Sequence, residues 1–379
     1  MADLDTEPIS YLDPYLPLFP LPVRLSSLVI LGIWLYGINL RIFHDMNLDT
    51  ATLLFYPTSP NHRSVFRLAA ILSLILGIST ATFWTVTGLG DVDLAQYYLV
   101  LPNITLLLIL LLAFVLPNRI LWPKQIWPTG RTRLRHTLLR IGIGGLAPEG
   151  SGRFGDILLA DALTSYARPI TEIYLSFRLL FTSADLPITA KGKVNREVHP
   201  WFLLLLFSWP FLIRMRQCHI ANQPANLLKY ATSIAVLAMS MIYSQDPSDP
   251  WAAWGLPVAA VVNTWYSFYW DVAHDWDLNL FFMEEYPRPS YPIGLRQRLL
   301  FSTWKYYAMI ALDLVLRFMW TARFLAPHFN GTEHGIFVVE VLEIVRRFLW
   351  TFFRVETEQL RKLKEPSDTT EMEEQHMID

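Results

Sequence analysis

The sequence predicts an all-helical bundle that crosses a membrane about nine times. Of its 379 residues, 53% are hydrophobic and only 17% are charged, and the mean hydropathy is +0.31. The charges are clustered, which leaves runs of roughly 20 apolar residues that are long enough to cross a bilayer as helices. In lipid, only helices and closed barrels satisfy all backbone hydrogen bonds, and runs of this length indicate helices.

The remaining composition narrows the class further. A single cysteine, Cys218, excludes an intrachain disulfide framework and a cysteine-based metal site. Residues 1–22 are acidic and lack the basic region of a cleavable signal peptide, so we expect a short lumenal lead and a first membrane helix that acts as the targeting signal. The spans are expected at about 23–40, 65–87, 97–116, 155–182, 200–216, 226–244, 252–272, 302–325 and 335–353.

Charge in the connections predicts the orientation. Residues 117–140 contain several arginines and a lysine but no acid, which places this loop in the cytosol; its position between spans argues against a nucleic-acid site. Part of it, residues 131–146, is expected to form an amphipathic helix on the membrane surface. The N-terminus is then lumenal and the C-terminus cytosolic, with Asn330 as a lumenal glycosylation candidate. Residues 361–379 are expected to be an acidic, disordered cytosolic tail.

The stretch 263–276 ends a very apolar segment with two carboxylates. On one helix, Asp271 and Asp275 share a face, as do Trp270 and His274. Carboxylates at the end of a membrane segment are costly unless they are paired or face a wet interior. The alternative is that they cap the helix at headgroup level, with the aromatic residues as an interfacial belt.

Other ionisable residues also lie inside the predicted spans, where each costs a few kcal/mol at the bilayer centre. Asp313 with Arg317 and Glu343 with Arg347 are spaced as i,i+4 ion pairs, so one interpretation is that these charges only tie the bundle together. The further members of the set are Asp156, Asp161, Lys229, Glu340 and Arg346.

The cations favour a second interpretation. Arginine binds a tetrahedral oxyanion through its planar fork and lysine adds a point charge, while nearby carboxylates would keep the binding weak enough for release. This pattern suits a pathway for a small anion such as phosphate and does not suit a metal site. No nucleotide-binding, hydrolase or metalloprotease motif is present, so we expect neither a cofactor nor an enzyme. A membrane-embedded lipid hydrolase or acyltransferase that uses Asp271, His274 and Asp275 stays as a minor alternative.

Three long blocks resemble the signature blocks of the EXS domain family: 263–276, 313–320 and 343–358. Weaker blocks agree in order and spacing at 154–165, 214–218 and 226–230. The resemblance covers about residues 130–360, so 131–360 is the expected EXS core and 23–130 the peripheral transmembrane part. The family includes plant and animal phosphate exporters and a yeast Golgi protein named for defective retention of ER lumenal proteins. The chain lacks the SPX domain of the exporters, which implies the short Golgi-type branch.

The resemblance implies a phosphate path and a function. Trp320 would be its gate, Thr164 stands where an asparagine is expected, and Asp275, Glu343 and Asp313 are secondary. The implied function is phosphate transport from the Golgi lumen to the cytosol, in support of glycosylation and of lumenal protein retention. The ER membrane is a second location, and a homodimer is compatible with this function. The alternative is a protein that does not transport phosphate. It would act as a membrane adaptor whose cytosolic loops bind a Golgi coat adaptor or glycosyltransferases. The implied path residues are Asp161, Lys229, Tyr230, Asp271, Arg317, Arg346 and Arg347.

Overall fold

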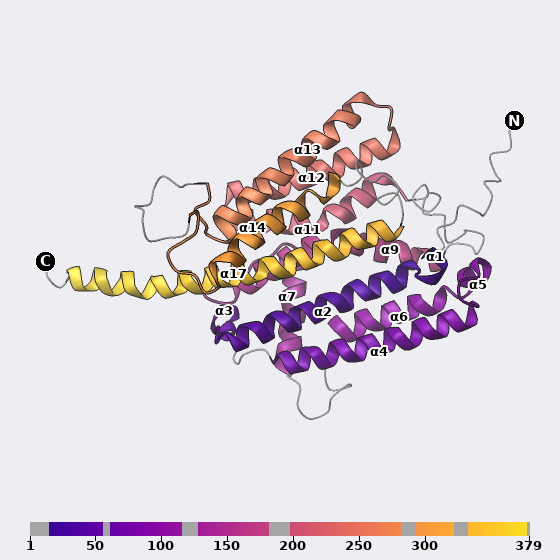
Figure 1. Cartoon of the computed structure of the whole chain (residues 1–379), viewed down its shortest axis with the longest axis horizontal. Coiled ribbons are helices and arrows are strands. Elements are labelled where there is room, and N and C mark those ends of the chain that lie inside the picture. Colours follow the sequence, from indigo (N-terminus) through magenta and orange to yellow (C-terminus); the bar gives the residue numbers. More distant parts are fainter. Residues whose placement is uncertain are drawn as a thin grey trace.

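The computed structural model describes residues 15–55, 61–115, 128–181, 198–281, 293–321 and 333–376. Every regular element within these ranges is a helix, which confirms the predicted all-helical class. The long helices lie side by side in an elongated bundle, and the final helix extends beyond it (Figure 1). The glycosylation candidate Asn330 lies outside the described residues.

The N-terminal part is a group of three long elements with short helices at their ends (Figure 1). Helices α2, α4 and α6 pack against one another through an apolar cluster that includes Ile30, Leu72 and Ile109. The elements are α1 (Tyr15–Leu18), α2 (Leu21–Asp45), α3 (Thr50–Leu54), α4 (His62–Val86), α5 (Val92–Tyr97) and α6 (Val100–Leu110), which a π-helical turn, Leu111–Val115, extends.

The C-terminal part surrounds its last helix. Helix α17 contacts α2, α8 and α14, while α11, α12 and α13 pack in sequence along one side of the bundle (Figure 1). A π-helical segment, Asp271–Asp275, extends α13, and a 3₁₀ turn, Met319–Thr321, follows α14. The helices are α7 (Pro128–Gly142), α8 (Arg153–Ser165), α9 (Ala167–Phe181), α11 (Pro200–Ile220), α12 (Pro224–Gln245), α13 (Pro250–Trp270), α14 (Thr303–Arg317) and α17 (Glu333–His376).

Local sequence signals explain several helix starts. Asp49, Asp91 and Asp249 each precede a helix and accept a hydrogen bond from a backbone amide of its first turn. Hydrogen bonds from the Thr52 hydroxyl and amide also lower the pKa of the Asp49 carboxyl below its usual range. Proline stands in the first turn of α11, α12 and α13, where its missing N–H has no helical partner to lose.

Three of the described helices are long and apolar enough to cross a bilayer: α2, α4 and α12. A shorter apolar helix covers Val100–Val115. Other long helices carry charged side chains that are buried in the bundle, such as Asp271 and Arg346. The chain is therefore a multi-pass membrane protein, and the number of nine spans stays a prediction.

One predicted span is two helices. The segment expected at 155–182 consists of α8 and α9, which are separated at Tyr166. Pro169 explains the break, because its ring has no amide to donate and clashes with the carbonyl group four residues earlier. The Tyr166 hydroxyl donates to the backbone carbonyl of Leu28 at 3.0 Å and contacts α2 at Gly32.

Two other boundaries also differ from the prediction. The span expected to reach 325 leaves the α-helical conformation after Arg317. The span expected to end at 353 continues in α17 as far as His376, so the segment predicted as a disordered tail is helical up to that residue. Glu, Lys, Arg and Gln are good helix formers, and an i,i+4 ion pair between Arg354 and Glu358, at 3.3 Å, supports the extension.

Candidate functional site

A network of buried ionised side chains joins α8, α11, α12, α14, α17 and the end of α13. Its acids include Asp161, Asp271 and Asp313, which are 4%, 1% and 0% exposed. Its cations include Arg214 and Arg346, each 4% exposed. Burial of this kind is tolerated only when opposite charges and hydrogen bonds compensate for lost hydration. The contacts therefore decide which charges hold the fold and which can bind an ion.

Asp271 lies at the centre of the network. It is the first residue of the π-helical segment, an irregularity that is frequent at functional sites. Its carboxylate accepts a hydrogen bond from Arg317 and lies 3.6 Å from the Arg346 guanidinium and 3.9 Å from the Lys229 ammonium. The structure thus brings together four residues that the sequence predicted for one path, from α12, α13, α14 and α17.

A second carboxylate holds two of these arginines. Asp313 lies 2.9 Å from Arg317 and 3.1 Å from Arg346, so the predicted i,i+4 pair on α14 is present and also reaches α17. The predicted i,i+4 pair of Glu343 with Arg347 is wrong. Glu343 pairs instead with Arg346 at 2.7 Å, because the Ser165 hydroxyl donates to the same carboxylate at 2.8 Å and holds it there.

Arg347 differs from its neighbours in the network. Its guanidinium donates to the hydroxyls of Ser165, at 3.3 Å, and Thr164, at 3.4 Å. It also stacks on Trp350, with 4.5 Å between the guanidinium carbon and the ring centroid. All of these partners are neutral, and among the described residues no ion pair includes Arg347. Its direct contacts are therefore neutral, and the carboxylates of Asp161, Asp271 and Glu343 act on its charge only from beyond ion-pair distance.

The opposite side of the network is built around Asp161 on α8. Arg214 lies 2.7 Å from this carboxylate, and the Tyr230 hydroxyl donates to it at 2.6 Å. The Arg214 Nε in turn donates to the Tyr230 oxygen at 3.0 Å. Lys229, next to Tyr230, pairs with Asp275 at 3.4 Å, so Asp275 belongs to the network.

Trp320 and Thr164, two of the predicted site residues, also make hydrogen bonds. The Trp320 indole donates to the Thr264 hydroxyl at 3.0 Å, which ties the turn after α14 to α13. The Thr164 hydroxyl donates to the Asp161 backbone carbonyl at 2.7 Å and accepts from Arg347. A threonine at this position therefore keeps a hydroxyl beside the Arg347 guanidinium.

Several intramembrane charges lie outside the network. Asp156 binds Arg140 at 2.5 Å and the Ala147 amide at 2.7 Å, and so anchors α7 on α8. Glu340 lies 3.4 Å from Arg168 at the start of α9. These charges have structural partners between helices, as the ion-pair interpretation predicts.

Sequence analysis missed some charged residues with clear roles. Arg214 was noted only within the block 214–218, although an arginine near the end of a predicted span was itself a signal. Arg296 was also missed: it pairs with the fully buried Glu356 at 2.6 Å, and no motif indicated their proximity because they are distant in sequence. Arg354 lies 3.8 Å from Asp275 and extends the network along α17.

Comparisons with known proteins show that the chain is similar to ERD1 proteins and to a plant phosphate transporter. The chain is 27% identical to Protein ERD1 homolog 1 of Schizosaccharomyces pombe, over 94% of this chain and 95% of that protein. It is 30% identical to Protein ERD1 of Kluyveromyces lactis, over 54% of this chain and 58% of that protein. It is 25% identical to Phosphate transporter PHO1 of Arabidopsis thaliana, over 94% of this chain but only 44% of the plant protein.

The family match extends across both parts of the bundle. The EXS family model matches residues 19–360, from the residues before α2 to the part of α17 that carries the network. The predicted core, residues 131–360, is therefore shorter than the match, which also includes α2, α4 and α6. This protein belongs to the EXS family.

Proposed function

We propose that this protein moves inorganic phosphate from the Golgi lumen to the cytosol and thereby supports glycosylation and the retention of ER and Golgi lumenal proteins. The name of the Arabidopsis relative, a phosphate transporter, supports the substrate. The likeness to ERD1 proteins over nearly the whole chain supports a role shared with that short branch.

The environment of Arg347 is the observation that carries the proposal. A guanidinium bonded to two hydroxyls and stacked on an indole keeps its full charge and part of its donor capacity. Phosphate oxygens are strong acceptors for such a planar fork. Ser165 and Thr164 each have one hydroxyl proton, which is donated to Glu343 and to the Asp161 carbonyl, so either hydroxyl turns toward an arriving oxyanion only by giving up that bond.

The neighbouring ion pairs suit transient binding. Arg317 and Arg346 are fixed by Asp271 and Asp313, so their positive charge is largely balanced before an anion enters. An anion that approaches Arg347 exchanges water for arginine donors but also meets these carboxylates. The result is a site that binds phosphate weakly enough to release it, as transport requires.

Further roles follow from the same arrangement. Lys229 and Tyr230 are adjacent on α12, where Lys229 offers a point charge to the ion and Tyr230 offers its hydroxyl only by giving up its hydrogen bond to Asp161. Trp320, bonded to Thr264 after α14 ends, is our candidate gate. We propose no enzymatic role, in part because the His274 side chain is exposed and stacks on Trp270, with ring centroids 4.2 Å apart.

Topology completes the proposal. The basic loop 117–140 would face the cytosol, which places the N-terminus in the lumen and the far end of α17 in the cytosol. Arg133 in this loop region donates to the backbone carbonyl of Leu54 at 3.1 Å, whereas Arg135 is exposed. Arg135 therefore provides a control that tests the adaptor alternative without removing a contact of the fold.

The test is flux of labelled phosphate into liposomes that contain the purified chain, with sulfate as competitor. We expect phosphate-selective flux that Arg347→Ala abolishes and Arg135→Ala leaves unchanged. Arg135→Ala should keep the wild-type melting temperature in detergent, and Arg347→Ala should remain folded with only a small decrease. Folded Arg347→Ala protein with normal flux would overturn the site. Absence of flux from folded wild-type protein, together with loss of lumenal protein retention in cells that express Arg135→Ala, would favour the adaptor function.

A further inference from the structure

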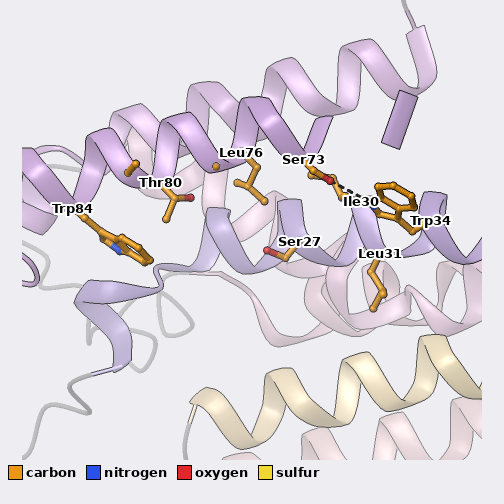
Figure 2. A pocket seen from close by; sticks show the side chains of 10 residues that line it. Ser27, Ile30, Leu31, Trp34, Ser73, Leu76, Thr80 and Trp84 are labelled. Atoms are coloured by element: carbon orange, nitrogen blue, oxygen red, sulfur yellow. Dashed lines mark hydrogen bonds between the residues drawn. The ribbon is translucent and has the colours of Figure 1, made fainter. Parts of the chain in front are cut away.

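A groove runs between α2 and α4 (Figure 2), and none of its lining residues belongs to the ion-pair network. It encloses about 480 Å³, a volume in the range of small-molecule sites. Trp34 marks one end of the groove and Trp84 the other (Figure 2). Since α2 and α4 are both long and apolar enough to cross a bilayer, a groove between them would lie within the membrane.

The groove occupies one leaflet. On α2 it extends from Ser27, close to the start of the helix, to Trp34 near its middle. On the antiparallel α4 it extends from Ser73 near the middle to Trp84, two residues before the end. Each helix has 25 residues and is roughly 37 Å long, so these limits correspond to about half of the bilayer. A ligand would therefore enter from the leaflet on the side where α2 begins.

Two hydroxyls lie level with each other near the outer end of the groove. The Trp34 indole donates to the Ser73 hydroxyl at 3.1 Å, which fixes the register of the two antiparallel helices. Ser27 is seven residues before Trp34 and Thr80 is seven residues after Ser73. Both are therefore roughly 10 Å from that hydrogen bond along their helices, toward the same membrane surface.

Both hydroxyls retain hydrogen-bonding capacity. Ser27 donates to the Val23 carbonyl at 2.8 Å, which leaves its oxygen free to accept. Thr80 is only 9% exposed and lines the groove, and its hydroxyl has no hydrogen-bond partner within the described part of the chain. An unsatisfied hydroxyl in a hydrocarbon environment is costly, so a ligand that pairs with it gains more than it would in water.

The rest of the groove excludes a charged headgroup. No lining residue carries a charge, so an anionic lipid would find no cation beside its phosphate. Toward the bilayer centre, the walls are Ile30, Leu31 and Leu76. Gly77 adds no side chain, and a Cβ built there would meet nothing within 4 Å, which leaves a flat strip of open space.

We propose that this groove binds a membrane sterol, with the sterol hydroxyl between Ser27 and Thr80 and the rigid ring system along Gly77 toward Trp34. A single hydroxyl at one end of a stiff apolar body matches the paired hydroxyls and the uncharged, flat interior. The inference does not depend on phosphate transport, because none of the groove residues belongs to the ion-pair network.

The experiment labels the full-length protein with a photoreactive sterol in phosphatidylcholine vesicles, with unlabelled sterol as competitor. Gly77→Phe fills the groove and should reduce competable labelling to background. Thr80→Val keeps the shape but removes the hydroxyl, and should weaken apparent affinity about fivefold. Leu74→Phe is the matched control: Leu74 is 64% exposed on the same helix and does not line the groove, so labelling should not change.

Other outcomes would overturn the proposal. These are equal labelling of all three variants, labelling that excess sterol does not displace, or labelling that excess diacylglycerol displaces better than sterol does. Dimer-specific crosslinks through Leu31→Cys that persist when sterol is added would assign the groove to a second copy of the chain. If Gly77→Phe does not fold, Thr80→Val decides alone, since an unchanged affinity there removes the hydroxyl pair from the argument.

Discussion

The two parts of the bundle are held together by different interactions. In the N-terminal part, α2, α4 and α6 join through apolar contacts and hydroxyl pairs such as Ser79 with Thr105, at 2.6 Å. In the C-terminal part, buried ion pairs around Asp271 and Asp313 join the end of α13 to α14 and α17, and the pair of Asp161 with Arg214 joins α8 to α11. The N-terminal part shows that this chain can pack membrane helices without charge. Helix packing alone therefore does not require the charges near α17.

The contrast also exists within the network, between adjacent residues. Arg346 contacts three carboxylates, those of Asp271, Asp313 and Glu343, whereas Arg347 contacts only neutral groups. In the proposed function, Arg346 mainly holds the fold and Arg347 binds the ion. Mutations that separate stability from flux should therefore distinguish the two.

The largest effect is expected for Arg346→Gln. Removing this cation leaves three carboxylates without one of their main partners in a buried site, which should cost about 3–5 kcal/mol. We expect a large fall in melting temperature in detergent and loss of flux with it. Arg135→Ala serves as the control, and a stable Arg346→Gln protein would show that the ion pairs are not structural.

Arg347→Gln should lose flux with much less effect on stability. No carboxylate of the described residues lies within ion-pair distance of it, so we expect a cost of only about 1 kcal/mol from lost hydroxyl and stacking contacts. The measurement is flux and melting on the same preparation. Equal destabilisation by Arg346→Gln and Arg347→Gln would break the contrast between them.

Gly32→Ala tests the junction between the two parts. A Cβ at Gly32 would collide with the Tyr166 hydroxyl at the break between α8 and α9. Overpacking of this kind should destabilise the protein by about 1–3 kcal/mol. Adding Tyr166→Phe removes the hydroxyl and should restore part of the loss. A double variant as unstable as Gly32→Ala would show that the collision is not the cause.

The smallest effect is expected for Ser79→Ala. A hydrogen bond between membrane helices contributes about 0.6 kcal/mol on average, so removing the one from Ser79 to Thr105 should shift the melting temperature only slightly. Flux should stay at the wild-type level, because this pair lies outside the network. A marked loss of flux would show that the N-terminal helices take part in transport.

Several features could be predicted from sequence because they depend on local pattern. Long apolar runs predicted α2, α4 and α12, and the i,i+4 spacing predicted the pair of Asp313 with Arg317. The spacing rule failed for Glu343 with Arg347, since it describes an isolated helix. In the bundle, the Ser165 hydroxyl and the neighbouring arginine compete for the same carboxylate.

The helix break at Tyr166 shows a second limit. Pro169 was visible in the sequence, but a proline in an apolar run can kink a helix or end it. The choice depends on what replaces the lost backbone contacts. Here the Tyr166 hydroxyl bonds to α2, a helix more than a hundred residues earlier in the chain.

The sequence by itself determined the all-helical class, the family resemblance and the set of residues that carry charge into the membrane. These follow from the free-energy cost of exposing backbone groups and charges to hydrocarbon, because that cost depends on the type of each residue in the segment. Only the tertiary structure decided how the charges pair, because pairing depends on distances between helices that are far apart in sequence. The tertiary structure also gave Arg346 and Arg347 different partners and placed Ser27 level with Thr80. Both results arise from packing between helices.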